Sequence, residues 1–301
     1  TLDKWKEVTF QVPDFERTVN DRDFLKDLLE PAMLPIAEEI EKSVLNELVF
    51  NTTANNSILG SSVASLTPDI IVDARTQLFK QKAPMSDAKN FHGIISGKDE
   101  GALLKTEKFT SSNFTGEPGQ AIQEAYMGRR YGFNLFPSQL VPAPTPGDTS
   151  GLINFGAGYT AGATTLIVDS FTSGQAPPVG SLVTIGALPE KYTVQPGTTI
   201  TSLVIYPGLS GAVADNDPIV VLNVNQNPFF HRNAVALAMR PLEKPMDGTG
   251  SQCVYVNYKG YGLRMEIYRD HSKKRHIVSF DALWAVKMLN QDLATRVISQ
   301  P

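Results

Sequence analysis

The sequence has little of what active sites and metal centres are usually built from. Its 301 residues include a single cysteine, Cys253, so no internal disulfide can form, and this fits folding in a reducing compartment. Only four histidines occur, and none belongs to an H-E-x-x-H pair. Cys253 has no Cys or His at ligand spacing. The sequence therefore predicts neither a disulfide framework nor a metal site.

Long apolar runs and an excess of positive charge are also missing. No run of about eighteen apolar residues occurs, which predicts no transmembrane helix and no membrane partner. The net charge is −4 and the pI about 5.6, so the chain as a whole does not attract nucleic acid or anionic membranes. Charged residues make up 19%, below the roughly 25% of typical soluble domains. This weakly favours a protein whose surface is covered by neighbours.

Common nucleotide-binding and hydrolase motifs are absent as well. There is no G-x-x-x-x-G-K-[ST] and no G-x-S-x-G. The glycine-rich GAGYTAG (156–162) has the wrong spacing for a dinucleotide loop, and it runs into a predicted strand where a helix N-terminus is needed. GLSG (208–211) lacks a strand–elbow–helix context, so Ser210 is interpreted as a turn residue.

The remaining titratable residues do not form a convincing constellation. His231 lies beside Arg232 and follows two phenylalanines, so it is a candidate for catalysis, but it is interpreted as a structural histidine at a strand edge. The pairs Glu38/Glu39 and Asp215/Asp217 are candidates for acid–base partners, but they are interpreted as solvated acids of a helix and a loop. We therefore predict no catalytic residue, no cofactor-binding residue, no metal ligand and no cofactor, and we expect that the protein is not an enzyme.

A half-buried strand and a long helix are predicted near the start of the chain. In residues 4–12, apolar side chains alternate with polar ones, which is typical of a strand. Over residues 23–50, apolar side chains recur every three or four positions, which predicts an amphipathic helix. Pro31 and Pro35 lie near its front, so the regular helix either starts at about Pro35 or is kinked there.

Helices and strands alternate over residues 63–140, which indicates a mixed α/β domain. The predicted elements are a polar loop at 51–62, a helix after the N-cap Thr67, a strand at 91–96, and helices at about 98–108 and 118–128.

The composition changes abruptly near residue 140. Between Arg130 and Arg232 there is one basic residue, Lys191, against five acidic ones. The difference, 1 − 5 = −4, equals the net charge of the whole chain. Short Val-, Ile- and Thr-rich segments separated by turn residues predict strands in this span. We interpret 148–223 as a small β domain inserted into the α/β domain.

The end of the chain predicts a β-hairpin over 261–280, and 281–299 is either a terminal helix or an extended segment. The hairpin turn carries the densest positive charge, Lys273 to His276, with Arg269 and Lys259 nearby. These residues are candidates for contacts with nucleic-acid phosphates. They are at least as well explained as a solvated loop, or as partners of acids on a neighbouring subunit.

Several stretches together resemble coat proteins of short-tailed bacteriophages, which have the Hong Kong 97-type capsid fold. The similar stretches are WKEVTFQV (5–12), as the end of the extended loop; LLEPAMLPIAEEIEKSVLNEL (28–48), as the spine helix; GRRYGFNLFPSQLVP (128–142), as the strand before the apical insertion; NPFFHRNAVALAMRPLEKP (227–245), as the return from the apical region; and 260–299, as the closing hairpin and tail.

The resemblance implies an α+β fold with an extended loop, a peripheral domain with a long spine helix, an apical α/β domain and a small inserted β domain. The N-terminal arm and the first strand of the extended loop, which this resemblance leads us to expect, do not precede Thr1 here. An upstream segment is expected to have been removed, cleaved or left out of the sequence, and whether Thr1 is a processing site stays open. The expected division is 1–20 for the end of the extended loop, 21–62 and 254–301 for the peripheral domain, 63–147 and 224–253 for the apical domain, and 148–223 for the inserted β domain.

The same resemblance implies the function of a major capsid protein of a tailed bacteriophage. Copies would assemble into pentamers and hexamers of an icosahedral shell around double-stranded DNA, which they would contact non-specifically. Scaffolding, portal and possibly decoration proteins are the other expected partners. The expected location is the virion capsid, assembled in the bacterial host cytoplasm. Two alternatives stay open: an encapsulin-like compartment shell, and a β-rich glycan-binding or adhesion protein.

Overall fold

The computed structural model describes residues 1–15, 24–51, 58–59, 65–111, 124–143, 150–171, 174–246 and 250–300. Contacts divide the chain into two compact units. Unit 1 comprises Thr1–Val44 and Ala236–Lys287, and unit 2 comprises Leu45–Val235 and Met288–Pro301.

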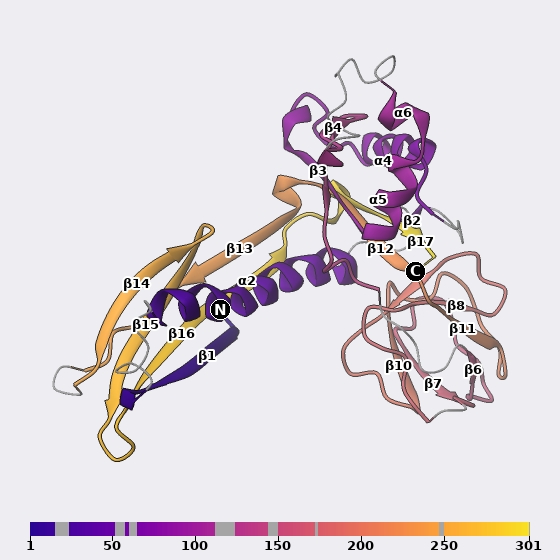
Figure 1. The fold of residues 1–301 in the computed structure, drawn as a ribbon. Coiled ribbons are helices and arrows are strands. Elements are labelled where there is room, and N and C mark those ends of the chain that lie inside the picture. Colours follow the sequence, from indigo (N-terminus) through magenta and orange to yellow (C-terminus); the bar gives the residue numbers. More distant parts are fainter. Residues whose placement is uncertain are drawn as a thin grey trace. The chain divides into compact units, whose positions relative to one another are not determined.

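Unit 1 is built on a long antiparallel sheet with one helix along it (Figure 1). The strand order is β1–β16–β15–β14, and β13 also pairs with β16. The predicted strand at 4–12 and the predicted hairpin at 261–280 are both confirmed. The elements are β1 (Lys4–Pro13), α2 (Phe24–Asn51), β13 (Val235–Arg240), β14 (Gln252–Tyr258), β15 (Tyr261–Asp270) and β16 (Arg275–Met288).

Helix α2 is held to this sheet by an apolar stripe. Ile36 and Ile40 have no exposed surface and pack with Phe280 and Trp284 of β16. Trp284 Nε1 also donates a hydrogen bond to Ser43 Oγ at 3.3 Å. Burial of one such isoleucine side chain contributes about 1.5–3 kcal/mol, so the stripe is a main source of the stability of the helix.

The two prolines lie inside α2, which is helical from Phe24 onward. Of the two alternatives considered above, a regular helix that starts at about Pro35 is therefore wrong, and the kink stays a prediction. Each interior proline removes one backbone hydrogen bond. Packing of the following turns against the sheet offsets this loss, because tertiary contacts supply most of the stability of a helix.

Unit 2 contains a six-stranded mixed sheet in the order β2–β17–β12–β3–β5–β4. Strand β12 pairs antiparallel with both β17 and β3, whereas β3 pairs with β5, and β17 with β2, in parallel. Residues 281–299 thus form no terminal α-helix: they are extended in β16 and β17, with a short 3-10 turn between these strands. The strands are β2 (Ile58–Leu59), β3 (Phe91–Ile95), β4 (Arg129–Arg130), β5 (Phe133–Pro137), β12 (Asn225–His231) and β17 (Ala294–Ser299).

Three helices pack on one face of this sheet. They are α4 (Pro68–Lys80), α5 (Gly97–Leu104) and α6 (Glu107–Thr110), and the short 3-10 turns are η1 (Ala88–Asn90), η2 (Arg232–Ala234) and η3 (Gln291–Leu293). Their buried side chains share one core with Phe91, Phe133 and Phe229 of the strands. A Cβ added at Gly93 would lie 2.6 Å from the ring of Phe229, so only glycine allows this packing.

The strands of the predicted inserted domain form a closed six-stranded barrel in the order β10–β7–β6–β11–β8–β9, with its own apolar core. Closure leaves no open sheet edge. The strands are β6 (Ser150–Ile153), β7 (Thr165–Asp169), β8 (Leu182–Ile185), β9 (Tyr192–Val194), β10 (Ser202–Tyr206) and β11 (Pro218–Leu222).

A fully buried arginine joins the barrel to the sheet of unit 2. Arg296 of β17 donates to Gln226 Oε1 of β12 and to Thr193 Oγ1 of β9, both at 2.9 Å. Gln226 Nε2 in turn donates to the carbonyl oxygen of Gly180 at 2.7 Å. Burial lowers the pKa of Arg296 to about 9, so the guanidinium is still charged at neutral pH. These acceptors reduce the cost of burying that charge.

A buried carboxylate ties together segments that are far apart in sequence. Asp99 of α5 has no exposed surface. Its Oδ1 accepts the Leu66 amide at 2.8 Å. Its Oδ2 accepts from Ser96 Oγ at 2.7 Å, Asn227 Nδ2 at 2.7 Å and Ser299 Oγ at 2.6 Å. Asp99 therefore joins α5 to β12, to β17 and to the segment before α4.

The helix predicted over 98–108 is two helices, α5 and α6. The two compact units do not follow the expected domain division: residues 288–301, assigned above to the peripheral domain, lie in unit 2, and 236–253, assigned to the apical domain, lie in unit 1. The expected domain boundaries stay predictions.

Two further expectations fall largely outside the described residues. Of the predicted loop at 51–62, Asn51 still belongs to α2 and Ile58–Leu59 form β2. Of the predicted helix at 118–128, residues 118–123 are not described, and Glu124 is the one helical residue in the described remainder.

Replacing Asp99 by alanine removes the acceptor of four hydrogen bonds and leaves their donors buried. We expect the apparent free energy of unfolding to fall by about 3–5 kcal/mol. Urea denaturation followed by circular dichroism measures this change. The matched variant Asp73→Ala, on the exposed side of α4, should change it by less than about 0.5 kcal/mol. Equal losses in the two variants would contradict the assignment.

Candidate functional site

The histidine considered for catalysis has a structural environment. His231 Nε2 lies 3.2 Å from Asp87 Oδ2, and only 1% of the His231 side chain is exposed. Its ring packs edge-on against Phe91 at 4.9 Å. In the part of the chain that the structure describes, no group of three His, Cys, Asp or Glu side chains is arranged to hold a metal ion.

The other residues considered as sites hold turns or lie at the surface. Ser210 Oγ donates to Glu190 Oε2 at 2.5 Å. Asp215 and Asp217 each accept a hydrogen bond from a backbone amide. Glu39 forms a partly exposed ion pair with Lys6. The structure does not bring these groups together, and the absence of enzymatic activity stays a prediction.

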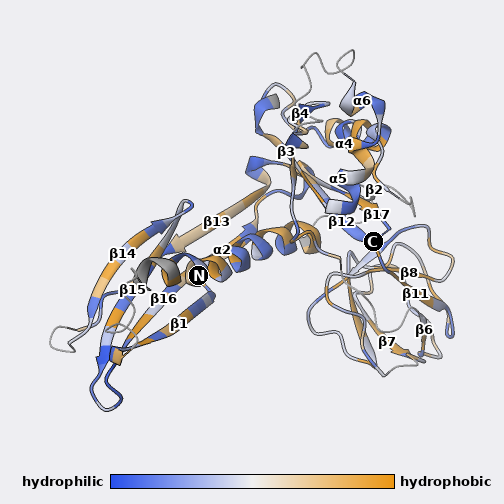
Figure 2. Ribbon diagram, in the orientation of Figure 1, coloured by the Kyte–Doolittle hydropathy of each residue, from blue (hydrophilic) through white to orange (hydrophobic). Residues whose placement is uncertain are grey.

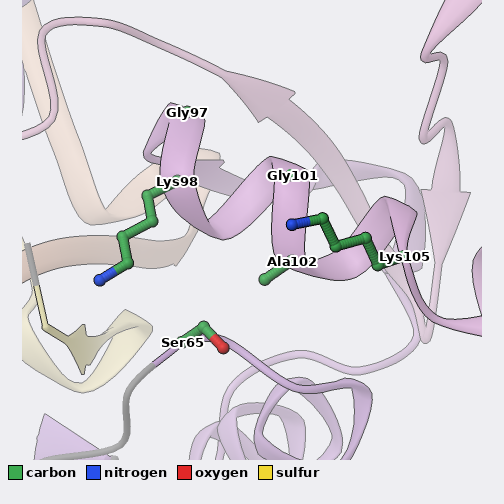
Figure 3. Close-up of a pocket in the computed structure, with 6 residues that line it drawn as sticks. All are labelled: Ser65, Gly97, Lys98, Gly101, Ala102 and Lys105. Atoms are coloured by element: carbon green, nitrogen blue, oxygen red, sulfur yellow. The ribbon is translucent and has the colours of Figure 1, made fainter.

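A hollow of about 580 Å³ lies along α5 (Figure 3). Lys98 projects from α5, Lys105 follows directly after its last residue, and Ser65 lies on the neighbouring segment. Lys98 Nζ donates to the carbonyl oxygen of Gln300 at 3.3 Å. The lining residues are Ser65, Gly97, Lys98, Gly101, Ala102 and Lys105. They include no carboxylate or histidine, so the hollow lacks the paired groups that acid–base catalysis needs.

No helix within the described ranges combines the length and the apolar character that crossing a bilayer requires.

The predicted basic cluster lies at the turn between β15 and β16, and an aspartate orders this turn. Asp270 Oδ1 accepts from Ser272 Oγ at 2.6 Å and from the amides of Ser272 and Lys273. Asp270 Oδ2 accepts from Arg275 Nε at 3.1 Å. These bonds, that of the Ser272 hydroxyl first, lower the pKa of Asp270 to about 2. The turn is therefore a fixed platform for the side chains it carries.

Two lysines carry the available positive charge of this turn. Arg269 pairs with Asp14 at 2.6 Å, and Arg275 pairs with the aspartate of the turn. Lys273 and Lys274 are exposed, and neither forms an ion pair with any residue that the structure describes. We call Lys273 and Lys274 the basic tip.

A cluster of charged side chains lies on the face of the unit 1 sheet that is turned away from α2. Arg264 Nη2 is 2.7 Å from Asp281 Oδ2 and 3.7 Å from Glu266 Oε2. Glu7 of β1 stands directly opposite Asp281 of β16 in the strand register. Two carboxylates thus pair with one guanidinium, and a third stands opposite one of them. We call Glu7, Arg264, Glu266 and Asp281 the outer acidic cluster.

Asp281 is the most enclosed member of this cluster. It is 2% exposed, and its Oδ1 accepts no hydrogen bond from the described residues. Burial raises the pKa of its carboxyl group, the hydrogen bond from Arg264 lowers it, and the charges of Glu7 and Glu266 raise it again. Like charges that face each other across a strand pair are destabilising. The cluster therefore carries more negative charge than its one arginine neutralises.

Exposed aromatic side chains surround the outer acidic cluster. Trp5 precedes Glu7 by two residues in β1 and is 58% exposed. Tyr268 follows Glu266 by two residues in β15, and Tyr255 of β14 stands opposite Arg264. Polar and apolar segments alternate along these strands (Figure 2). Exposed Trp and Tyr side chains next to an Arg are typical of protein–protein interfaces, where these three residue types are enriched.

A pH titration tests how the turn is ordered. The bonds that lower the pKa of Asp270 stabilise the turn above the unfolded value of 3.8, and this stabilisation is lost as the pH falls through about 2. We expect a carboxyl NMR titration midpoint of about 2 for Asp270. The variant Ser272→Ala should raise it towards 3.8. The neighbouring change His271→Ala should leave it in place, and a midpoint near 3.8 in the unaltered protein would contradict the assignment.

Comparison with known proteins gives a match in structure and none in sequence. No protein-family model and no curated protein sequence matches this chain. The structure is similar to a chain from Mycobacterium phage Che8, over 98% of this chain and 70% of that one, with a TM-score of 0.52 and 12% identity. It is also similar to a chain from the capsid structure of cyanophage P-SCSP1u, over 99% and 73%, with a TM-score of 0.51 and 11% identity.

At sequence identities this low, the structural similarity establishes the fold alone. It extends over nearly the whole chain, including both units. The protein therefore has the Hong Kong 97-type fold of phage capsid proteins, as its resemblance to that family implied.

Proposed function

We propose that this protein is the major capsid protein of a tailed bacteriophage. Copies of it assemble into pentamers and hexamers, and these form an icosahedral shell around double-stranded DNA. The observation that carries the proposal is the fold it shares, over 99% of its length, with a chain of the cyanophage P-SCSP1u capsid. A single fold that extends over both units supports a role of the whole chain rather than of one domain.

The surface of unit 1 supports assembly on physical grounds. The outer acidic cluster and its aromatic rim have the composition of a contact surface, whereas a solvated sheet face would carry mostly isolated polar side chains. The net charge of −4 on 301 residues is small, so close packing of many copies meets little electrostatic repulsion. Closed shells also require contacts between unlike surfaces of neighbouring copies.

The proposal includes the partners that such a shell needs. Scaffolding and portal proteins, and possibly decoration proteins, would bind during assembly in the host cytoplasm, and the mature location would be the virion capsid. The DNA inside would be contacted without sequence specificity, through phosphate groups.

The two alternatives differ from the proposal in cargo or in ligand. An encapsulin-like shell would enclose a protein, and a glycan-binding protein would need an open aromatic platform. The barrel has one stacked aromatic pair at its surface, Phe155 and Tyr159, with ring centroids 4.9 Å apart. Because these two rings cover each other and the Tyr159 hydroxyl accepts the Ile167 amide, the pair does not favour the glycan alternative.

Expression in bacteria, with and without a scaffolding protein, tests the proposal. We expect uniform closed particles in negative-stain microscopy, and nuclease-resistant DNA inside particles recovered from infected cells. Particles that enclose a protein and no DNA would favour the compartment shell. A protein that stays monomeric at every concentration would overturn the proposal.

A further inference from the structure

We propose that the outer acidic cluster of one copy binds the basic tip of a neighbouring copy. This inference rests on the proposed function and deepens it, because it names one contact by which the copies join.

The outer acidic cluster has more negative charge than its own residues neutralise. Arg264 donates two hydrogen bonds to one oxygen of Asp281, Oδ2, at 3.0 and 2.7 Å, and a third to the carbonyl oxygen of Glu243. The other oxygen, Oδ1, is buried and accepts no hydrogen bond from the described residues. Glu7, directly opposite on β1, is exposed. A cation placed beside Glu7 would neutralise the surplus and relieve the repulsion between the two facing carboxylates.

A metal ion is a poor occupant of this position. No group of His, Cys, Asp or Glu side chains in the described residues has a metal-binding arrangement. The half-buried Arg264 would also repel a metal ion next to Asp281. A flexible ammonium group on a long side chain fits better, because it approaches from solvent and needs no fixed coordination geometry.

The two lysines of the basic tip are too far away within the same copy to be this cation. Asp281 lies six residues beyond Arg275 in β16. At about 3.3 Å per residue, this places it about 20 Å along the strand from the tip. A lysine side chain does not span that distance, so the basic tip can reach an outer acidic cluster only on another copy.

The basic tip is suited to be the partner because it is ordered and available. Asp270 fixes the turn through four hydrogen bonds, and the arginines beside it already have acidic partners. A preorganised turn loses little conformational entropy on binding. The aromatic rim around the cluster would exclude water from the contact, which strengthens an ion pair.

The contact joins two different surfaces, so each copy gives one tip and receives one. Such heterologous contacts form rings where the rotation between copies closes, and rings are the units of which a shell is made. The symmetry of the contact therefore agrees with the proposed assembly. DNA phosphate is the competing partner for the basic tip, and charge-exchange variants distinguish it from a neighbouring copy.

Charge exchange tests the contact directly. The variant K273E/K274E should raise the protein concentration needed for particle formation at least about tenfold, because like charges would then face each other. Adding Glu7→Lys should restore assembly to within about threefold of the original threshold. The matched variant K98E/K105E makes the same change of charge on α5 and should leave the threshold within about twofold.

Three other outcomes of the charge-exchange experiment would overturn the proposed contact. If K273E/K274E forms empty particles at the original concentration but loses packaged DNA, the tip binds DNA and the proposal is overturned. It is also overturned if Glu7→Lys fails to restore assembly, or if K98E/K105E blocks assembly to the same degree.

Cross-linking of the unaltered protein gives a second test that needs no variant to fold. Cys253 is half-exposed and stands opposite Glu266 in the strand register. A short reagent that joins a thiol to an amine should link Cys253 to Lys273 or Lys274 in assembled particles, and not in dissociated subunits. A link to Lys244, whose Nζ lies 5.7 Å from the ring centroid of Tyr255, should form in both and serves as the control.

The cross-linking outcomes separate the two proposals. Particles that give the Lys244 link and no link to the basic tip would overturn the contact and leave the proposed function standing. Failure to form particles under any condition would overturn the proposed function, and the contact with it.

Discussion

Strand β12 is paired along both edges and buried along most of its length, and the rest of unit 2 is arranged around that constraint. Its first three residues, Asn225, Gln226 and Asn227, are polar and almost fully buried. Buried polar groups must be hydrogen-bonded. Asn227 reaches Asp99 and Gln226 reaches Arg296, so the helices and the barrel are both tied to the same strand.

The same strand explains how a separate barrel fits into the chain. The chain leaves the sheet after β5 and returns to it as β12, and the barrel lies between them in sequence. The backbone amide of Gln226 donates to the carbonyl oxygen of Pro142 at 3.0 Å, so the segments that enter and leave the barrel lie side by side. A domain whose ends meet can be inserted without disturbing the sheet that carries it. Arg296 of β17 then fixes the barrel to the sheet through its hydrogen bonds to Gln226 and Thr193.

The features that depend on local pattern could be predicted from the sequence. The alternation of apolar and polar residues predicted β1 and the hairpin of β15 and β16, and it placed the basic tip at the turn of this hairpin. The charge balance and the turn residues of 148–223 marked the barrel. The helix α2 was predicted over residues 23–50, but its prolines left a later start at about Pro35 open. That alternative failed because packing against β16 overrides proline propensity.

The outer acidic cluster was missed because its parts are far apart in the sequence. Glu7 and Asp281 face each other only through the register of β1 and β16. The outward positions of Arg264 and Glu266 were visible in the alternation of β15, but nothing local indicates which strand lies beside them. The burial of Asp99 and Arg296 left no sequence signal, since charged side chains are expected at the surface.

The central claim is that copies of this chain join through unlike surfaces to form a closed shell. A three-dimensional reconstruction of purified particles by electron cryomicroscopy tests it most directly. We expect icosahedral particles whose repeating subunit has the fold of both units, with the basic tip of each copy against the outer acidic cluster of the next. A monodisperse monomer without particles at any concentration would contradict the claim.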